Sequence, residues 1–123
     1  MERSLQIILG ILSLICLAGG TNFLVKGAGA YLPKTTPPQP VLDNIFRFLS
    51  GIYFGITFLL IWSIFHITEI NTLIYLVGLI VICAGLGRLY SVIKVGSAGK
   101  NLYYIMILEI VVGLTMIILQ YFR

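Results

Sequence analysis

Four long runs of apolar residues alternate with three shorter polar connections along the chain. The runs cover residues 5–25, 43–65, 70–95 and 102–122. A helix of about 20 apolar residues crosses the hydrocarbon core of a bilayer, about 30 Å thick, because each residue adds about 1.5 Å of rise. Each run is long enough for such a crossing. The pattern therefore predicts an all-α polytopic membrane protein without strands, a single domain over residues 1–123 that folds as a four-helix antiparallel transmembrane bundle.

The composition agrees with a membrane protein and argues against a soluble one. Apolar residues make up 59% of the chain and charged residues 10%, and the mean hydropathy is +1.08. Soluble domains carry about 25% charged residues. A net charge of +4 would suggest a nucleic-acid partner in a soluble chain, but these charges fall at the ends of the apolar runs. We therefore expect membrane lipid as a partner and no nucleic acid.

The first run, residues 5–25, could be mistaken for a signal peptide. A lipoprotein cleavage box needs a small residue where Ile15 stands, so we expect a retained transmembrane helix. One face of this helix carries mainly small residues, which favour close packing against another helix. They are Gly10, Ser13, Leu17 and Gly20.

Residues 26–41 form a long polar connection between the first two runs. Its Pro37, Pro38 and Pro40 favour extended backbone and exclude a helix. Ordered loops of this length in compact proteins are often functional. A plain linker and a lid over a pocket both remain open. We expect the next helix to begin just after this connection, with Asp43 or Asn44 as its N-cap.

Polar residues inside the apolar runs gather toward one membrane boundary. Chain direction alternates, so the connections after the first and third runs lie on one side of the membrane. Within about two or three helical turns of that side lie Asn22, Asp43, Asn44, Arg47, Arg88 and Glu109. An ionisable group at membrane depth needs a partner or water, and it is by default a functional-site hypothesis. We predict that these six residues line a ligand-binding pocket in one leaflet.

Helical periodicity predicts which of these charges meet. Three of them share a helical face with a glycine, in the pairs Arg47–Gly51, Arg88–Gly85 and Glu109–Gly113. Gly51 and Gly55 also form a GxxxG pattern, which lets another backbone approach closely. We predict that Glu109 meets Arg88 between the third and fourth runs, with Arg47 close enough to join them.

Two interpretations of this cluster remain open, and they are compatible. In the first, Arg88 and Glu109 form an ion pair that pins two helices, and Asp43 pairs with Arg47 one turn away. In the second, the cluster lines a pocket for a polar or anionic ligand. Arginine suits that role because its planar fork donates two hydrogen bonds to a carboxylate or phosphate.

Few other residues suggest chemistry. Cys16 and Cys83 form no CxxC and no metal-binding pattern, so we interpret them as small buried hydrophobes, with a redox pair as the alternative. His66 is the only histidine, and we expect it at a solvated helix end rather than on a metal. Residues 94–100 lack the P-loop pattern. We therefore expect no cofactor and no metal.

Several short motifs resemble those of a known family. They are Leu42-Asp-Asn-Ile-Phe-Arg47-Phe48 followed by Gly51 and Gly55, Gly87-Arg88-Leu89 with Ser91, and Leu108-Glu109. Together they resemble a bacterial family of four-helix membrane proteins catalogued as a domain of unknown function, over essentially all four runs. A more distant similarity in size and layout links the chain to DoxX-like proteins, some of which are implied to be subunits of quinone-linked oxidoreductases. The resemblance implies a bacterial inner-membrane location and implicates Asp43, Asn44, Arg47, Arg88 and Glu109, but it implies no substrate.

Two classes of function follow from these observations. The first is an accessory or lipid- or small-anion-binding membrane protein with a charged pocket in one leaflet, alone, as a homo-oligomer or in a larger membrane complex. The alternative is a membrane enzyme or redox subunit that acts on a quinone-like or other lipophilic substrate, with Glu109 as proton carrier. A transporter is disfavoured, because the opposite half of the runs carries almost no polar group for a pathway.

Lysines predict the orientation of the chain in the membrane. Lys26, Lys34, Lys94 and Lys100 lie in or beside the connections after the first and third runs. Cytoplasmic loops carry an excess of lysine and arginine. We therefore expect these two connections in the cytoplasm and both termini outside.

Overall fold

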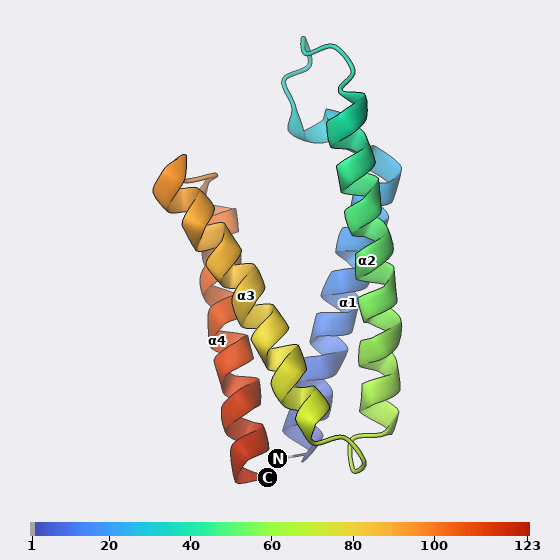
Figure 1. Ribbon diagram of the computed structural model, residues 1–123, viewed down its shortest axis with the longest axis vertical. Coiled ribbons are helices and arrows are strands. Elements are labelled where there is room, and N and C mark those ends of the chain that lie inside the picture. The colour runs from blue at the N-terminus through green and yellow to red at the C-terminus, as the bar shows by residue number, and fades with distance from the viewer. Residues whose placement is uncertain (1) are drawn as a thin grey trace. The chain divides into compact units, whose positions relative to one another are not determined.

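Four α-helices make up most of the chain. The computed structural model describes residues 2–123, and Figure 1 shows the four helices with their connections. They are α1 (Glu2–Lys26), α2 (Pro40–Phe65), α3 (Thr72–Lys94) and α4 (Lys100–Phe122), with a short 3-10 helix, η1 (Gly29–Tyr31), between α1 and α2. Residues 2–123 contain no strand, and each α-helix is long and apolar enough to cross a membrane. The predicted all-α membrane class is confirmed.

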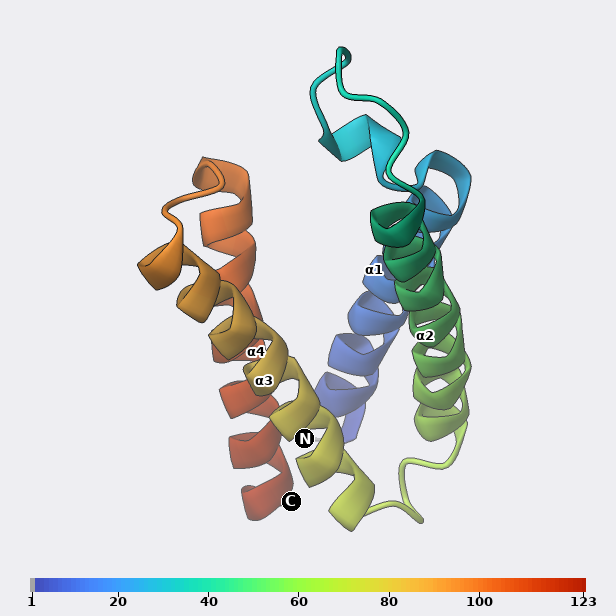
Figure 2. The same ribbon diagram turned by 45° about the horizontal axis from the view of Figure 1, so that its top comes forward.

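The described residues divide into two compact units. One comprises the residues up to Ile8 together with His66–Arg123, and the other comprises Leu9–Phe65. α3 and α4 therefore form one helical hairpin, and most of α1 forms another with α2 (Figure 2). The prediction of a single domain stays a prediction.

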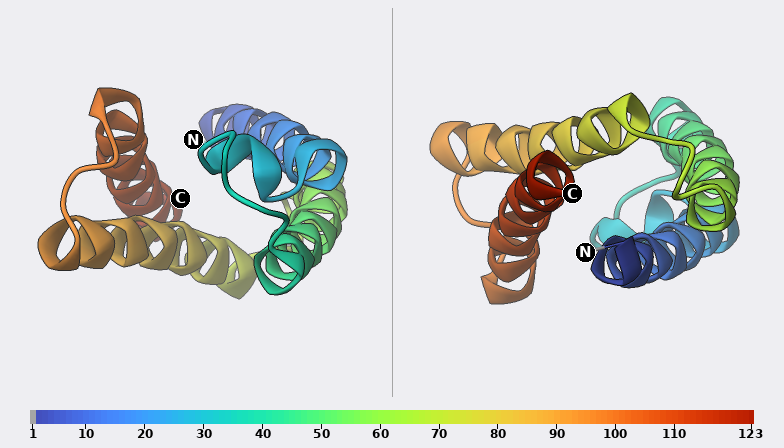
Figure 3. Two further views of the ribbon diagram at one scale, coloured as in Figure 1. Left: turned by 90° about the horizontal axis from the view of Figure 1, so that it is seen from above. Right: turned by 90° about the horizontal axis from the view of Figure 1, so that it is seen from below.

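Glycines let α3 and α4 pack backbone against backbone. A Cβ atom built on Gly85 would lie 2.6 Å from Cγ1 of Ile110, and one built on Gly113 would lie 2.7 Å from the carbonyl oxygen of Gly78. Real side chains do not tolerate such separations, so these positions require glycine or a shift of the helices. The two helices cross obliquely, as the end-on views in Figure 3 show. The glycine faces predicted for these two helices are confirmed.

α1 and α2 approach each other through Gly20, on the small-residue face predicted for α1, and not through the GxxxG pattern of α2. A Cβ atom on Gly20 would lie 3.2 Å from the carbonyl oxygen of Ser50. At Gly51 and Gly55, in contrast, no heavy atom of the described residues lies within 4 Å of an added Cβ atom. α1 therefore does not make the close approach that the GxxxG pattern predicted.

The start of α2 corrects two predictions. The helix begins at Pro40, inside the connection where the prolines were expected to exclude a helix. Proline is tolerated in the first helical turn, where its missing N–H would have no intrahelical partner. Asp43 consequently lies within the helix, and its own N–H donates to the carbonyl oxygen of Gln39 at 2.9 Å. Neither Asp43 nor Asn44 is the N-cap.

The last residue of the chain closes the turn between α2 and α3. The Arg123 guanidinium donates to the carbonyl oxygens of Ile67 at 2.7 Å and Ile70 at 2.6 Å, and to Oδ1 of Asn71 at 2.9 Å. These bonds satisfy carbonyl groups that the turn leaves without helical partners. Sequence reasoning missed this role of Arg123.

Candidate functional site

Arg88 on α3 and Glu109 on α4 form an ion pair. Nε of Arg88 donates to Oε2 of Glu109 at 3.0 Å. The side chains are 37% and 22% exposed, so the pair is only half-buried. The predicted meeting of these two residues is confirmed.

The glycine packing explains why this pair forms. Gly85 lies one turn before Arg88 and Gly113 lies one turn after Glu109, and both glycines are at the contact between the two helices. Side chains one turn apart point to the same face of a helix. The close approach of the backbones therefore brings the guanidinium and the carboxylate together, about 9 Å from the end of α3 at the usual helical rise.

Arg88 uses only its Nε for the bond to Glu109. Its other N–H groups have no hydrogen-bond partner among residues 2–123. Arg88 also lines a cavity of about 150 Å³ between the end of α3, the connection and the start of α4. The cavity combines the guanidinium and two hydroxyl groups with small and apolar side chains, and it is lined by Arg88, Ser91, Val92, Gly96, Ala98, Leu102 and Tyr103.

Asp43 and Arg47, both on α2, form a second ion pair that is closed by hydrogen bonds to the chain itself. Nε of Arg47 donates to Oδ2 of Asp43 at 2.7 Å, one helical turn away. Oδ1 of Asp43 accepts from the N–H of Ala28 at 3.1 Å, and Nη1 of Arg47 donates to the carbonyl oxygen of Leu24 at 2.8 Å. The i,i+4 pair proposed from the sequence is confirmed, and it ties the start of α2 to the end of α1.

Gly27 allows the start of α2 to contact the end of α1 in this way. Gly27 follows α1 with φ of +61°, and its N–H donates to the carbonyl oxygen of Phe23 at 3.0 Å. A Cβ atom on Gly27 would lie 2.0 Å from Oδ1 of Asp43. Left-handed φ is costly for residues other than glycine. The backbone conformation and the missing side chain at Gly27 therefore both serve the contact with Asp43.

The remaining two predicted site residues take no part in either ion pair. Asn22 donates to the hydroxyl of Tyr31 in η1. The side chain of Asn44 is exposed and makes no hydrogen bond within the described part of the chain. The six predicted residues thus fall into separate groups: Arg88 and Glu109 in one unit, and the other four in the other. The meeting of Arg47 with Arg88 and Glu109 stays a prediction.

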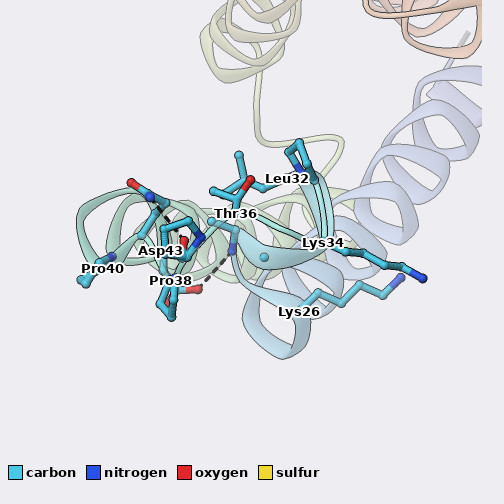
Figure 4. A pocket seen from close by; sticks show the side chains of 12 residues that line it. Lys26, Leu32, Lys34, Thr36, Pro38, Pro40 and Asp43 are labelled. Atoms are coloured by element: carbon cyan, nitrogen blue, oxygen red, sulfur yellow. Dashed lines mark hydrogen bonds between the residues drawn. The ribbon is translucent and has the colours of Figure 1, made fainter.

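The connection after α1 borders a larger cavity. Sequence reasoning left two interpretations of this connection open, a plain linker and a lid over a pocket. The cavity has a volume of about 460 Å³ and lies between residues 26–39 and the start of α2. We call it the connection pocket. Figure 4 shows Lys26 and Lys34 at one edge of it, both extending away from Asp43. Sequence reasoning used these lysines only to orient the chain, because no motif or regular spacing links an exposed lysine to a pocket.

Aromatic contacts hold the wall of the connection pocket in place. The ring of Tyr31, in η1, lies edge-on to Phe46 and Phe23, with centroids 5.5 and 5.8 Å away. The rings of Phe23 and Phe46 stack at 5.4 Å. Since Phe23 belongs to α1 and Phe46 to α2, these contacts fix η1 onto both helices.

The cysteines and the histidine were the other residues considered for chemistry. Residues 2–123 hold no group of three or more His, Cys, Asp or Glu side chains near enough to bind a metal ion. Cys16 is half-buried and Cys83 is exposed, and neither forms a disulfide bond within the described residues. The expectation that Cys83 is buried is wrong, because its face of α3 is not the glycine face that packs on α4.

Comparison with known proteins identifies the family. No curated protein matches the chain, and no solved structure matches it. A family model described as a domain of unknown function, DUF4345, matches residues 4–120, which include both ion pairs and the connection pocket. The chain is therefore a member of the DUF4345 family of unknown function.

Proposed function

We propose that this protein binds the anionic group of a membrane lipid or of a small lipophilic anion at Arg88, in the inner membrane of a bacterium. One observation carries the proposal: Arg88 makes a single side-chain hydrogen bond among the described residues, to Glu109, and also lines a cavity. An arginine used only to pin two helices would have more of its donors satisfied within the protein, as Arg47 has at both Nε and Nη1.

Electrostatics favours an anion at this position. A guanidinium inside the apolar part of a membrane protein needs a partner for its N–H groups. Glu109 balances the charge of Arg88 but accepts only from Nε. The free edge of the guanidinium can donate two parallel hydrogen bonds to a carboxylate or phosphate, the geometry that arginine fits best.

The size and lining of the cavity indicate how much of a ligand enters. Sites for whole drug-sized ligands measure about 300–1,000 Å³, so a cavity of about 150 Å³ accepts a headgroup and not a lipid tail. Ser91 and Tyr103 offer hydroxyl groups, and Val92 and Leu102 offer apolar surface beside them. An acyl chain would leave the cavity along the apolar surface of the helices.

Lipid titration followed by native mass spectrometry tests the proposal. The purified protein in detergent is mixed with phosphatidylglycerol, lauric acid or neutral phosphatidylcholine. We expect both anions to bind more tightly than phosphatidylcholine, and Arg88→Lys to weaken them about tenfold because lysine lacks the two-pronged fork. Equal binding by Arg88→Lys and the natural protein would contradict the proposal.

Two matched variants sharpen this experiment. Tyr103→Phe removes a hydroxyl from the cavity, whereas Tyr104→Phe makes the same change at the next residue, which does not line it. Arg3→Lys makes the Arg88→Lys change at an exposed arginine of α1. We expect weaker anion binding by Tyr103→Phe and unchanged binding by the two controls.

The alternative function, a quinone-linked enzyme or redox subunit, has one observation in its favour. Oε1 of Glu109 accepts no hydrogen bond among the described residues, so it could take a proton from the hydroxyl of a bound quinol or return one to the carbonyl oxygen of a bound quinone as it is reduced. Ubiquinone-1 in the same titration tests this alternative. Binding of ubiquinone-1 that Glu109→Gln abolishes, without binding of the two anions, would favour it over the lipid-binding function.

A further inference from the structure

We propose that residues 36–40 are a docking segment for a partner protein that binds polyproline II helix in an aromatic-lined groove with an acidic rim. Polyproline II is an extended left-handed helix with three residues per turn. We call residues 36–40 the proline segment. This proposal is independent of the function proposed for Arg88, because the proline segment belongs to the other unit.

The composition of the proline segment restricts its backbone at every residue. Its sequence is Thr36-Pro37-Pro38-Gln39-Pro40. Each proline ring fixes φ near about −65°. Thr36, Pro37 and Gln39 each precede a proline, and a residue in that position is restricted to extended or polyproline II backbone. Residues 37–39 belong to no helix, strand or turn, and α2 begins at Pro40. The covalent structure of the segment therefore favours polyproline II geometry without help from a partner.

The proline segment also leaves free the groups that a partner would contact. Pro37, Pro38 and Pro40 are all exposed. With three residues per turn, Pro37 and Pro40 lie on one ridge, which is the PxxP spacing that aromatic-lined grooves bind. The carbonyl oxygens of Thr36 and Pro38 accept no hydrogen bond within residues 2–123. A partner can therefore reach both the rings and the backbone acceptors.

The proline segment is held at both ends. On one side the N–H of Thr36 donates to the carbonyl oxygen of Pro33 at 2.9 Å, and the preceding η1 is fixed by the aromatic contacts of Tyr31. On the other side the chain continues directly into α2. Figure 1 shows the connection extending beyond the start of α2. A segment that is already in its binding geometry loses less conformational entropy on binding, which a plain flexible linker would not offer.

The charge of the connection indicates an acidic rim on the partner. Residues 26–41 contain two lysines and no acidic residue. Lys26 and Lys34 are exposed, and neither ammonium group has a partner within residues 2–123. Figure 4 shows both lysines extending in the same direction, away from Asp43. Opposite charges across an interface speed the encounter of the partners and fix their register. Carboxylates beside the groove would therefore complement these two lysines.

Titration of two purified groove domains onto the full chain in lipid nanodiscs tests the proposal. The probes are a Src-homology 3 domain that recognises a basic residue beside PxxP, and a WW domain, with binding measured by biolayer interferometry. Pro37→Ala removes one ring of the ridge, and Pro33→Ala makes the same change at an exposed proline outside the segment. We expect at least one domain to bind, about tenfold more weakly to Pro37→Ala and within about twofold to Pro33→Ala. No binding of either domain at about 1 mM, or equal losses in the two variants, would overturn the proposal.

Further measurements separate a protein partner from lipid and from misfolding. Lys34→Gln should weaken binding of the Src-homology 3 domain about threefold, whereas Lys94→Gln, after α3, should leave it unchanged. Binding should be the same in neutral phosphatidylcholine and in anionic phosphatidylglycerol nanodiscs. Loss of binding in the anionic nanodiscs would mean that lipid headgroups cover the segment, and it would overturn the proposal. Circular dichroism should show equal helix content in Pro37→Ala and the natural protein, because residue 37 lies outside every helix.

Discussion

The two arginine–carboxylate pairs of this protein have the same chemistry but different surroundings. Arg47 uses Nε for Asp43 and Nη1 for a backbone carbonyl at the end of α1, and Asp43 uses its second oxygen for the N–H of Ala28. Arg88 makes one bond, to Glu109, and lines a cavity. We call Asp43–Arg47 the closed pair, because backbone groups make further hydrogen bonds to both of its side chains. We call Arg88–Glu109 the open pair, because its side chains make no hydrogen bond among the described residues beyond the one between them.

This difference shows that a charge within an apolar run does not by itself define a site. Both arginines satisfy the same sequence criterion, since each lies in a long apolar run near one boundary. What separates them is how many of their N–H groups the backbone satisfies. The closed pair is a structural tie, and the open pair is the better candidate for ligand binding.

We expect the largest loss of stability from a substitution at Gly27, which contacts the closed pair. Gly27→Ala places a Cβ atom 2.0 Å from Oδ1 of Asp43 and puts alanine at φ of +61°. We expect a loss of about 3 kcal/mol in unfolding free energy, from the left-handed conformation and the displaced carboxylate together.

Unfolding in mixed detergent micelles, followed by circular dichroism, measures this loss. The control is Gly51→Ala, because no heavy atom of the described residues lies within 4 Å of the added Cβ atom there. Equal stability of the two variants would show that the Asp43 contact does not hold the end of α1.

A smaller loss is expected from removing the acid of the open pair. Glu109→Gln leaves the half-buried Arg88 without a counter-charge, and we expect it to cost about 2 kcal/mol, less than a fully buried pair because Arg88 is 37% exposed. Tyr104→Phe on another face of α4 should have little effect. The exchanged pair, Arg88→Glu with Glu109→Arg, should recover part of the loss in the same unfolding measurement.

No recovery in the exchanged pair would mean that the two charges do not interact across α3 and α4. Recovery would support the open pair as a contact that depends on charge and not on the identity of each side chain. Neither result bears on the ligand-binding proposal, because that proposal rests on the donors of Arg88 that Glu109 does not use.

Helical periodicity was sufficient to predict the open pair. Arg88 and Glu109 lie on consecutive helices joined by a short connection, and each shares a face with a glycine of the helix contact. When both partners are on regular helices, the period of 3.6 residues determines which side chains can meet. The same reasoning predicted the four apolar helices and their approximate bounds.

The closed pair was predictable only in part, because its other contacts depend on irregular backbone. The i,i+4 spacing predicted the bond between Asp43 and Arg47, but the bonds to Ala28 and Leu24 need the chain to reverse at Gly27. No periodic pattern specifies that reversal. The start of α2 was misplaced for a related reason, since Pro40 was interpreted as a helix breaker although proline suits the first turn.

The smallest expected effect compares the same substitution in both pairs. Lysine keeps the positive charge of arginine but cannot donate to the carboxylate and to a backbone carbonyl in the geometry of the planar fork. Arg47→Lys should therefore lose the bond to the carbonyl oxygen of Leu24 and cost about 1 kcal/mol. Arg88→Lys loses no second bond to the protein, so its cost should stay below about 0.5 kcal/mol. Unfolding of the two variants under identical micelle conditions measures the difference. Equal costs would mean that Arg88 has a second partner within the protein, and the distinction between a closed and an open pair would then fail.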